Sequence, residues 1–347
     1  MLKKNLLVIF GGKSPEHEVS RTSASMIIDN IDKSKYDMFV LGITKEGKWL
    51  IFENYNSTKI KDGTWEDEGK EAYILPNNSK TLLILENEGT KEFKVDVAFN
   101  IIHGNTGEDG KIQGLLELAG IPYVGCNTVS SAICMDKAFT KIIIDIINIP
   151  QARYMIIKDT YDIEVIEKII GYPCFIKPAN SGSSIGISKV KNNKELAEGI
   201  KTAFKYDEKI VIEEGIKGKE VECAVLGNEN PLISTVGEIT YTAEFYDYET
   251  KYVSDDSKAI IPTTLEESTI NKIREYTKEI YKILDCKGLA RLDFFVENGT
   301  NDVIFNEINT LPGFTPISMY PMLMEHEGIS KRELIDRLID LALERRD

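Results

Sequence analysis

Short apolar runs alternate with amphipathic patterns through the first third of the chain. Residues 6–10 form a continuous apolar run, and the pattern after it predicts a helix over about 18–31. Further strands are expected over 36–44 and 96–102. Alternating strands and helices predict an open parallel sheet that binds ligands at the carboxyl ends of its strands. The region 52–92 is polar and lacks a clear period, so we expect it to be peripheral.

The middle of the chain combines one long helical pattern with a hairpin. The helix is expected over about 129–147, where it ends before a proline. The two strands of the hairpin are expected over 172–177 and 187–190. A helix over about 194–204 and a strand over 209–214 complete this part of the pattern.

The last third returns to strands and ends on a helix. Strands are expected over 220–226 and 232–239, and a helix over about 266–284. The stretch 241–259 between them is polar, aromatic and without a period, which is typical of an active-site lid. Ser330 stands three residues before a glutamate in a capping box, which predicts where the final helix begins.

The stretch 289–319 contains the most informative pattern in the chain. Two apolar strands flank a polar turn, and Arg291 and Asp293 share one face of the first strand. Glu307 and Asn309 share one face of the second strand. Charges in an apolar hairpin are costly unless they are paired or bind a metal, and these oxygen ligands suit Mg²⁺. The alternative is an exposed face with an ordinary ion pair, which the strongly apolar strands make less favourable.

Two loops rich in small residues favour an anionic ligand. The loop 178–186 contains glycines and serines, whose N–H and hydroxyl groups can approach phosphate oxygens closely. Lys177 before this loop and Lys137 on the long helix would add positive charge. Near the first sheet, the loop 11–14 and His103 both follow strands, at the edge where ligands bind. Together these features favour a nucleotide phosphate site.

Composition excludes several classes of partner. The 347 residues carry a net charge of -14, which argues against nucleic acid and anionic membrane surfaces. Five scattered cysteines without a Cys-x-x-Cys spacing predict reduced core thiols rather than disulfides or a zinc site. The apolar run near the N-terminus is too short for a signal peptide, and no stretch approaches membrane-spanning length, so we expect a cytoplasmic protein.

Length and element order predict three domains in a mixed α/β and α+β fold. A chain of this length exceeds one typical core. The expected division is 1–125 for an N-terminal α/β substrate domain, 126–213 for a central subdomain with the phosphate loop, and 214–347 for a C-terminal domain with the lid and metal site. Nucleotides often bind in a cleft between such domains.

Seven segments in order along the chain resemble the ATP-grasp enzymes and, within them, the D-alanine–D-alanine ligase family. They are FGGKSPEHEVS (10–20), HGNTGEDG (103–110), MDK (135–137), KPANSGSSIG (177–186), FYDYETKY (245–252), RLD (291–293) and NEINTLPG (306–313). Each motif is weak alone, but the set is specific and spans nearly the whole chain. The resemblance implies a three-domain ATP-grasp architecture and ATP-dependent ligation of two D-alanines through an acylphosphate, for peptidoglycan precursor synthesis.

The resemblance implies roles for the nucleotide side of the site. Asp293, Glu307 and Asn309 match the metal ligands, for two Mg²⁺ ions with Mn²⁺ as an alternative. The expected phosphate contacts come from the two lysines and the serine loop: Lys137, Lys177, Ser183 and Ser184. Glu213, Ile216 and Glu220 match the adenosine side, and Phe245 is a further expected nucleotide contact.

The resemblance also implies two amino-acid subsites. Glu16 and His103 match the residues that hold the first D-alanine, and Ser183 and Tyr252 match partners that link Glu16 to the lid. Arg291 and the N–H of Gly313 match the donors to the tetrahedral oxyanion, a large catalytic effect when such donors are preorganised. Lys251 and Ser318 match the groups that hold the second carboxylate.

Two alternatives stay open on the sequence. Met319 stands where D-serine ligases tend to carry arginine, so D-alanine is favoured as acceptor, yet a D-alanine–D-serine ligase is the nearest alternative. Pro316 and Ile317 replace a Ser-His pair of many relatives and would reshape the wall of that subsite. A non-catalytic nucleotide-binding regulator is the alternative of another class, and the family resemblance further implies a homodimer.

Overall fold

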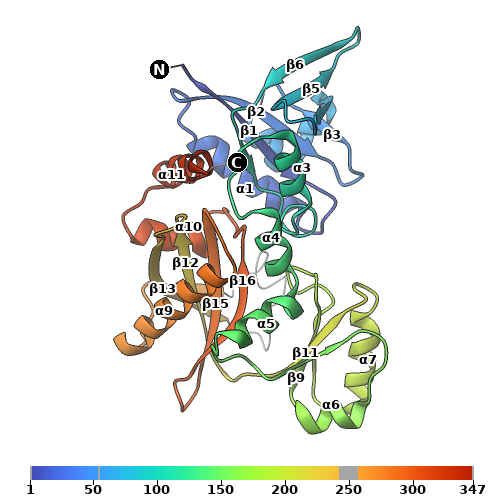
Figure 1. The fold of residues 1–347 in the computed structure, drawn as a ribbon, viewed down its shortest axis with the longest axis vertical. Helices are drawn as coiled ribbons and strands as arrows, with labels where there is room; N and C mark the ends of the chain where they lie inside the picture. The colour runs from blue at the N-terminus through green and yellow to red at the C-terminus, as the bar shows by residue number, and fades with distance from the viewer. Residues whose placement is uncertain (1, 54, 242–256, 346–347) are drawn as a thin grey trace.

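Three β-sheets and their helices make up the molecule. A computed structural model of the chain describes residues 2–53, 55–241 and 257–345. In Figure 1 the N-terminal sheet lies at the top, and the other two sheets lie below it on opposite sides. Helices α4 and α5 run down the middle between these parts (Figure 1). The arrangement confirms the predicted mixed fold with several sheets.

The first sheet has seven strands in the order β6-β5-β4-β3-β2-β1-β7. Its core is parallel, because β1 pairs in parallel with both β2 and β7, while β3 to β6 join antiparallel. The predicted open parallel sheet is therefore extended by an antiparallel part. The strands are β1 Lys4–Gly11, β2 Tyr36–Ile43, β3 Trp49–Ile51, β4 Lys70–Ile74, β5 Thr81–Leu85, β6 Thr90–Lys94 and β7 Val97–Asn100.

The region 52–92 contributes more than the predicted peripheral segment. It supplies β4 and β5, the short helices α2 (Ser57–Asp62) and η1 (Thr64–Glu68), and the start of β6. Trp65 is fully buried, and its ring lies 4.8 Å from that of Phe10 on β1. The region lies at the edge of the sheet, as the prediction of a peripheral segment requires, but it also supplies buried core residues such as Trp65 and Leu82.

Two helices flank the loops of the first sheet. Helix α1 (His17–Asn30) follows β1, as predicted, and α3 (Lys111–Ala119) follows the loop after β7. The hydroxyl of Ser20 on α1 accepts a hydrogen bond from the Gly11 N–H and donates one to the Ile101 carbonyl. This serine therefore joins the ends of β1 and β7, where the ligand-binding edge was expected.

The long helix predicted over 129–147 is two helices, and that prediction was wrong. Helix α4 (Thr128–Met135) ends at Asp136, and α5 (Lys137–Ile146) begins after it. Asp136 has an extended backbone (φ -88°, ψ 98°), and its carboxylate accepts hydrogen bonds from the N–H groups of Ala138 and Phe139. It is therefore an N-cap inside an apolar pattern.

The second sheet has four strands in the order β10-β9-β11-β8, all antiparallel. It contains the predicted hairpin, whose strands are β9 and β10, and the predicted strand β11. The sequence pattern missed β8. The elements are β8 Tyr154–Ile157, α6 Ile163–Ile169, β9 Cys174–Pro178, β10 Ser188–Val190, α7 Asn193–Ala203 and β11 Ile210–Glu214.

The third sheet has five antiparallel strands in the order β14-β13-β12-β15-β16. The predicted hairpin forms β15 and β16 at one edge. The last residues of the predicted lid, 257–259, belong to β14, and residues 242–256 lie outside the described part of the chain. The elements are β12 Gly218–Leu226, β13 Leu232–Tyr241, β14 Ser257–Ile260, α9 Glu267–Ile283, β15 Leu289–Glu297, β16 Val303–Asn309, α10 Met319–His326 and α11 Lys331–Glu344.

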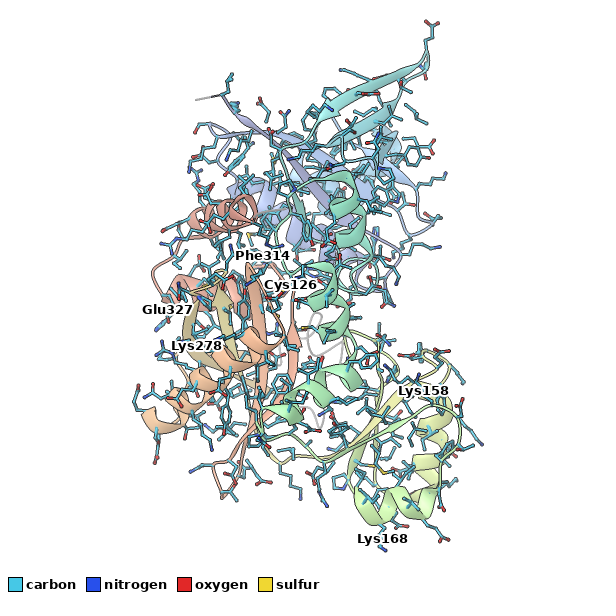
Figure 2. All side chains as sticks on the ribbon, viewed as in Figure 1. Cys126, Lys158, Lys168, Lys278, Phe314 and Glu327 are labelled. Atoms are coloured by element: carbon cyan, nitrogen blue, oxygen red, sulfur yellow. The ribbon has the colours of Figure 1, made fainter. Side chains whose placement is uncertain are left out.

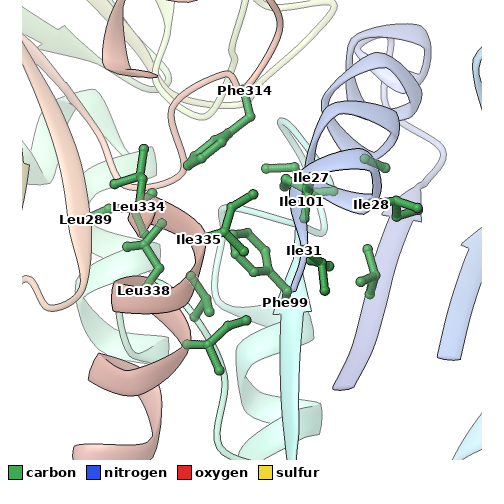
Figure 3. Close-up of a cluster of buried hydrophobic side chains, with 14 of the residues drawn as sticks. Ile27, Ile28, Ile31, Phe99, Ile101, Leu289, Phe314, Leu334, Ile335 and Leu338 are labelled. Atoms are coloured by element: carbon green, nitrogen blue, oxygen red, sulfur yellow. The ribbon is translucent and has the colours of Figure 1, made fainter. Parts of the chain in front are cut away.

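One hydrophobic cluster joins the two ends of the chain. Residues of α11, including Ile335 and Leu338, pack with residues of α1 and β7 (Figure 3). Phe314 lies in the same cluster, and its ring centre is 6.1 Å from that of Phe99 on β7. Figure 2 places Phe314 and Cys126 near the middle of the molecule, far from Lys158 and Lys168 on the lobe of the second sheet.

Two further predictions were tested by the structure. All five cysteines are buried and free, in agreement with reduced core thiols. The side chain of Ser330 accepts a hydrogen bond from the Glu333 N–H, which confirms the predicted start of the final helix. None of the helices in the described part of the chain is long and apolar enough to cross a membrane.

Candidate active site

A cavity of about 390 Å³ brings together residues from all three parts of the chain. The residue before α1, the loop after β7, the loop between β9 and β10, and the hairpin β15–β16 all contribute to its wall. The predicted site residues that line it are Glu16, His103, Lys137, Ser183, Ser184, Arg291, Glu307, Asn309, Gly313, Ser318 and Met319. The cavity thus gathers motifs that are far apart in sequence.

Several predicted residues lie elsewhere. Lys177, Glu213 and Glu220 are on strands of the second and third sheets, Ile216 lies between β11 and β12, and Asp293 is buried behind the wall. None of these five is among the described residues that line the cavity. The predicted residues Phe245, Lys251 and Tyr252 lie outside the described part of the chain.

The hairpin β15–β16 sets the register of its polar residues. Asp293 lies opposite Glu307, and Arg291 lies opposite Asn309, so all four share one face of the sheet. The guanidinium of Arg291 donates from Nε and NH2 to the two carboxylate oxygens of Asp293, at 2.8 and 2.7 Å. The Asn309 amide donates to the same carboxylate at 3.0 Å. The predicted alternation of faces is therefore present, with an ion pair at its centre.

The donor chemistry of this hairpin fits a hard cation. Asp293, Glu307 and Asn309 offer carboxylate and amide oxygens, the ligands that Mg²⁺ prefers beside substrate phosphates. The described residues contain no group of three or more His, Cys, Asp or Glu arranged to hold a metal, and this set has only two carboxylates. To bind a cation, Asn309 would turn its amide oxygen toward the site and Asp293 would release part of its contact with Arg291.

Glu222 is a cavity residue that the sequence pattern did not reveal. It lies on β12 directly opposite Asp293 and is 3% exposed. One of its carboxylate oxygens is 2.9 Å from Nε of Arg291. Burial alone would lower the pKa of Arg291, but Asp293 and Glu222 outweigh it and raise that pKa, so the guanidinium stays charged. The signal available in the sequence was a glutamate between the apolar residues Val221 and Cys223 of a predicted strand.

Glu16 and the serine loop meet across the cavity. The hydroxyl of Ser183 donates a hydrogen bond to the carboxylate of Glu16. Ser183 and Ser184 have φ of 47° and 60°, in the left-handed region that residues with a side chain rarely adopt. Such conformations persist where surrounding contacts hold them and are common at ligand sites. The backbone of this loop is therefore held in an uncommon conformation at the serines that face Glu16.

His103 contacts a serine of helix α1 and a glutamate of its own loop. Its Nε2 lies 3.0 Å from the hydroxyl of Ser23 on α1, and that hydroxyl also accepts a hydrogen bond of 3.2 Å from the Phe314 N–H. Its Nδ1 lies 3.8 Å from the carboxylate of Glu108. These contacts orient the ring at the cavity wall, beside the turn that carries Gly313.

The expected phosphate lysines have partners in this structure. Lys137, at the start of α5, donates a hydrogen bond to the Ser181 carbonyl in the serine loop. Lys177 on β9 and Lys141 on α5 both form ion pairs with Glu213 on β11. Burial would raise the pKa of Glu213, but the two lysines outweigh it and lower that pKa to about 2. The sequence pattern missed Lys141, since nothing local marks it as the partner of Glu213.

The turn after β16 forms the other end of the cavity. The hydroxyl of Ser318 accepts a hydrogen bond of 3.0 Å from the Thr315 N–H and lies 2.8 Å from the Thr315 hydroxyl. A Cβ on Gly313 would lie 2.7 Å from the Ser318 hydroxyl, so glycine lets the two segments approach. Met319 is buried at the start of α10. This end of the wall combines hydroxyl groups with apolar side chains.

Comparison with known proteins gives the family. Family models described as "D-ala D-ala ligase N-terminus" and "D-ala D-ala ligase C-terminus" match residues 5–126 and 143–340. The chain belongs to the D-alanine–D-alanine ligase family. It is 51% identical over 364 residues to a D-alanine–D-alanine ligase of Acetivibrio thermocellus, an alignment that covers 99% of this chain and 96% of that one. It is 48% identical to that of Caldicellulosiruptor bescii, with the same coverage.

Solved structures of this ligase family have the same fold. The VanG D-Ala:D-Ser ligase of Enterococcus faecalis is 38% identical, with a TM-score of 0.90 over 98% of this chain and 100% of that one. The D-alanine–D-alanine ligase of Coxiella burnetii is 33% identical, with a TM-score of 0.86 over 99% of this chain and 94% of that one. The expected ATP-grasp architecture is thereby confirmed.

Proposed function

We propose that this protein joins two D-alanine molecules to D-alanyl-D-alanine with ATP, for bacterial peptidoglycan precursors. The carboxylate of the first D-alanine attacks the γ-phosphorus and releases ADP. The amine of the second attacks the resulting acylphosphate carbon, loses a proton and expels phosphate. The observation that carries the proposal is the cavity itself, whose wall brings Arg291 and Gly313 together with the hydrogen-bonded pair of Glu16 and Ser183.

The amino-acid subsites follow from charge and position. Glu16, hydrogen-bonded to Ser183, offers a carboxylate to the ammonium of the first D-alanine, and His103 borders the same subsite. Arg291 and the Gly313 N–H are donors for the oxyanion that forms as the amine attacks. Ser318, with Lys251 from outside the described residues, would hold the carboxylate of the second D-alanine.

The nucleotide subsite lies on the side of the serine loop. Lys137, Ser183 and Ser184 would contact phosphate oxygens, joined by Lys177 once it exchanges Glu213 for a phosphate. The adenosine contacts are assigned to the strand β11 and the residues after it, Glu213, Ile216 and Glu220. Phe245, outside the described residues, would be a further nucleotide contact. A divalent cation, Mg²⁺ as two ions or Mn²⁺ in its place, would neutralise phosphate charge when bound by Asp293, Glu307 and Asn309.

The domain division and the biological setting complete the proposal. The segments 1–125, 126–213 and 214–347 each contain one of the three sheets, although helix α11 packs against the first. The protein would act in the cytoplasm as a homodimer, on small molecules and not on nucleic acid or membranes. Membership of the ligase family sets aside the non-catalytic regulator as an account of this chain.

One assay tests the reaction. The protein is incubated with ATP, Mg²⁺ and D-alanine at alkaline pH, and ADP, phosphate and dipeptide are measured together. The expected result is one ADP and one phosphate for each dipeptide. ATP turnover without dipeptide, or no turnover, would reject the proposed reaction. Replacing D-alanine by L-alanine is the control for stereochemistry.

D-Serine as acceptor is the second candidate, because a D-Ala:D-Ser ligase is among the similar structures. The apolar side chain of Met319 at the cavity wall offers no partner to a serine hydroxyl, which favours D-alanine. Equal concentrations of both amino acids in one assay separate the two, with the dipeptides distinguished by mass. A mixed dipeptide in excess would favour the second candidate.

A further inference from the structure

Glu222 is a buried carboxylate at the cavity to which the proposed reaction gives no role. It is on β12, opposite Asp293 on β15, and diagonal to Arg291, which lies two residues from Asp293 on the same strand. Its carboxylate oxygen lies 2.9 Å from Nε of Arg291. The side chain of Glu222 is 4% exposed and that of Arg291 is 15% exposed. A pair this poorly hydrated is electrostatically strong, and loss of either member leaves a buried charge uncompensated.

Arg291 is shared between two carboxylates. Its Nε lies 2.8 Å from one oxygen of Asp293 and 2.9 Å from Glu222, while its NH2 lies 2.7 Å from the second oxygen of Asp293. The contact with Asp293 therefore occupies both oxygens of a predicted metal ligand. A cation at Asp293 competes with Arg291 for those oxygens, and Glu222 is the partner that can keep the guanidinium in place.

We propose that Glu222 is a positioning residue, which holds Arg291 at the cavity when Asp293 turns to a divalent cation. This inference rests on the proposed function, in which Arg291 donates to the oxyanion and Asp293 binds the cation. Without Glu222, the two roles conflict, because cation binding would take the carboxylate of Asp293 away from Arg291 and leave the guanidinium without its main partner. With Glu222, Arg291 retains an anionic partner from the neighbouring strand.

The charges of the cluster support this division of roles. The three carboxylates of Glu222, Asp293 and Glu307 and the one guanidinium leave two negative charges, which a divalent cation balances. Neutralising Glu222 leaves one negative charge and makes Asp293 the principal partner of Arg291. Neutralising Glu222 should therefore lower the cation affinity and displace Arg291 at the same time. An ion pair that only stabilises the fold would not couple these two effects.

The test compares two neutralised glutamates of the same sheet. Glu222→Gln removes the charge beside Arg291, and Glu238→Gln is the matched control. Glu238 is also buried, on β13, and its carboxylate pairs with Lys219 and accepts a hydrogen bond from Thr263, but it does not line the cavity. Each variant removes the charge of a buried carboxylate that forms an ion pair, so both should lower the melting temperature. Only Glu222→Gln should change cation binding and the chemical step.

Three measurements are made on each full-length protein. Binding of Mn²⁺ in the presence of ADP is followed by the electron paramagnetic resonance of free Mn²⁺, and kcat and KM are measured for D-alanine and ATP. For Glu222→Gln we expect Mn²⁺ affinity to fall at least about 5-fold and kcat about 100-fold, since an oxyanion donor is displaced. Both KM values should stay within about 3-fold of the wild type, because ground-state contacts remain.

The outcomes separate the inference from the proposed function. Wild-type kcat and Mn²⁺ affinity in Glu222→Gln, with only a lower melting temperature as in Glu238→Gln, would overturn the inference. If Glu222→Gln does not fold, Glu222→Asp decides: its shorter carboxylate should keep Mn²⁺ affinity and lower kcat about 10-fold, and an unchanged kcat overturns it. If the wild type forms no dipeptide, the proposed function fails while the Mn²⁺ titration still tests Glu222.

Discussion

The hydroxyl of Ser183 donates a hydrogen bond to the carboxylate of Glu16, across 167 positions of the sequence. Glu16 lies at the start of α1 in the first part of the chain, and Ser183 lies in the loop between β9 and β10. The contact therefore closes the cavity between two parts of the fold whose relative position no local pattern specifies. It links the loop that faces phosphate to the residue that faces the first D-alanine.

Removing this hydroxyl should weaken the first subsite. In Ser183→Ala the Glu16 carboxylate loses a donor and its fixed orientation, so KM for the first D-alanine should rise about 10-fold, the equivalent of one charged hydrogen bond. Steady-state kinetics analysed with a separate KM for each of the two D-alanine subsites measure this. Ser188→Ala, on β10 after the same loop, is the control and should behave as the wild type. An unchanged KM in Ser183→Ala would contradict the role of the contact.

Glu213 should make the stability of the protein dependent on acid pH. Its pKa is about 2 in the folded protein, below the ordinary 4.5, because Lys141 and Lys177 outweigh the cost of burial. A lowered pKa contributes stability that is present above pH 4.5 and is lost as pH falls from about 4.5 to about 2. The amount is on the order of 3 kcal/mol. Urea unfolding at a series of pH values measures it.

The variant Glu213→Gln isolates this contribution. It should be less stable than the wild type at pH 7, since two buried lysines lose their anionic partner. The difference between the two proteins should shrink as pH falls below 4.5, because the wild-type carboxyl then takes up its proton. A difference that stays constant over that range would contradict the assignment of the low pKa to Glu213.

Adding a methyl group at Gly313 should disturb catalysis more than folding. A Cβ there would lie 2.7 Å from the Ser318 hydroxyl, which is too close, so that hydroxyl must move away. Gly313→Ala should lower kcat about 100-fold, because the N–H of residue 313 is a proposed oxyanion donor. Gly114→Ala on α3 has ordinary contacts at 3.8 Å and is the control, with unchanged kcat. Equal kcat in both variants would contradict the role of the Gly313 N–H as an oxyanion donor.

Asp136 should combine two separable contributions to stability. One carboxylate oxygen caps α5, and the other accepts from the buried Lys209. Asp136→Asn keeps an oxygen for the cap but loses the ion pair, and should cost about 3 kcal/mol. Asp136→Ala also loses the cap and should cost about 1 kcal/mol more. Denaturant unfolding measures both; equal stability of the two variants would show that the cap contributes nothing.

Much of the fold could be predicted because its signals are local. The alternation of polar and apolar residues around Arg291 and Asp293 was sufficient to place β15, and the turn before Val303 was sufficient to place β16. The break at Asp136 was missed because the apolar period continues across it, although aspartate is a good N-cap. The buried residues of 52–92, such as Trp65 and Leu82, were missed because they are spread through a polar stretch without a clear period.

The site residues divide in the same way. Glu16, His103 and the serine loop belong to short motifs, so they could be predicted as site residues from the sequence. The structure adds that they line one cavity. Glu222 and Lys141 were missed because their importance lies in partners on other elements, Arg291 and Glu213. A charged residue on an apolar strand or helix face is the only local signal that either one leaves.

The cluster that joins α11 to α1 also bears on how the protein is made. Ile27 and Ile31 near the end of α1 lie in one buried cluster with Ile335 and Leu338 of α11, which is synthesised much later than α1. Until α11 leaves the ribosome, the part of α1 that packs in this cluster lacks those partners, although N-terminal domains usually fold first. The N-terminal part can therefore complete this cluster only after α11 has been synthesised, and a nascent chain arrested before α11 would expose that surface to chaperones.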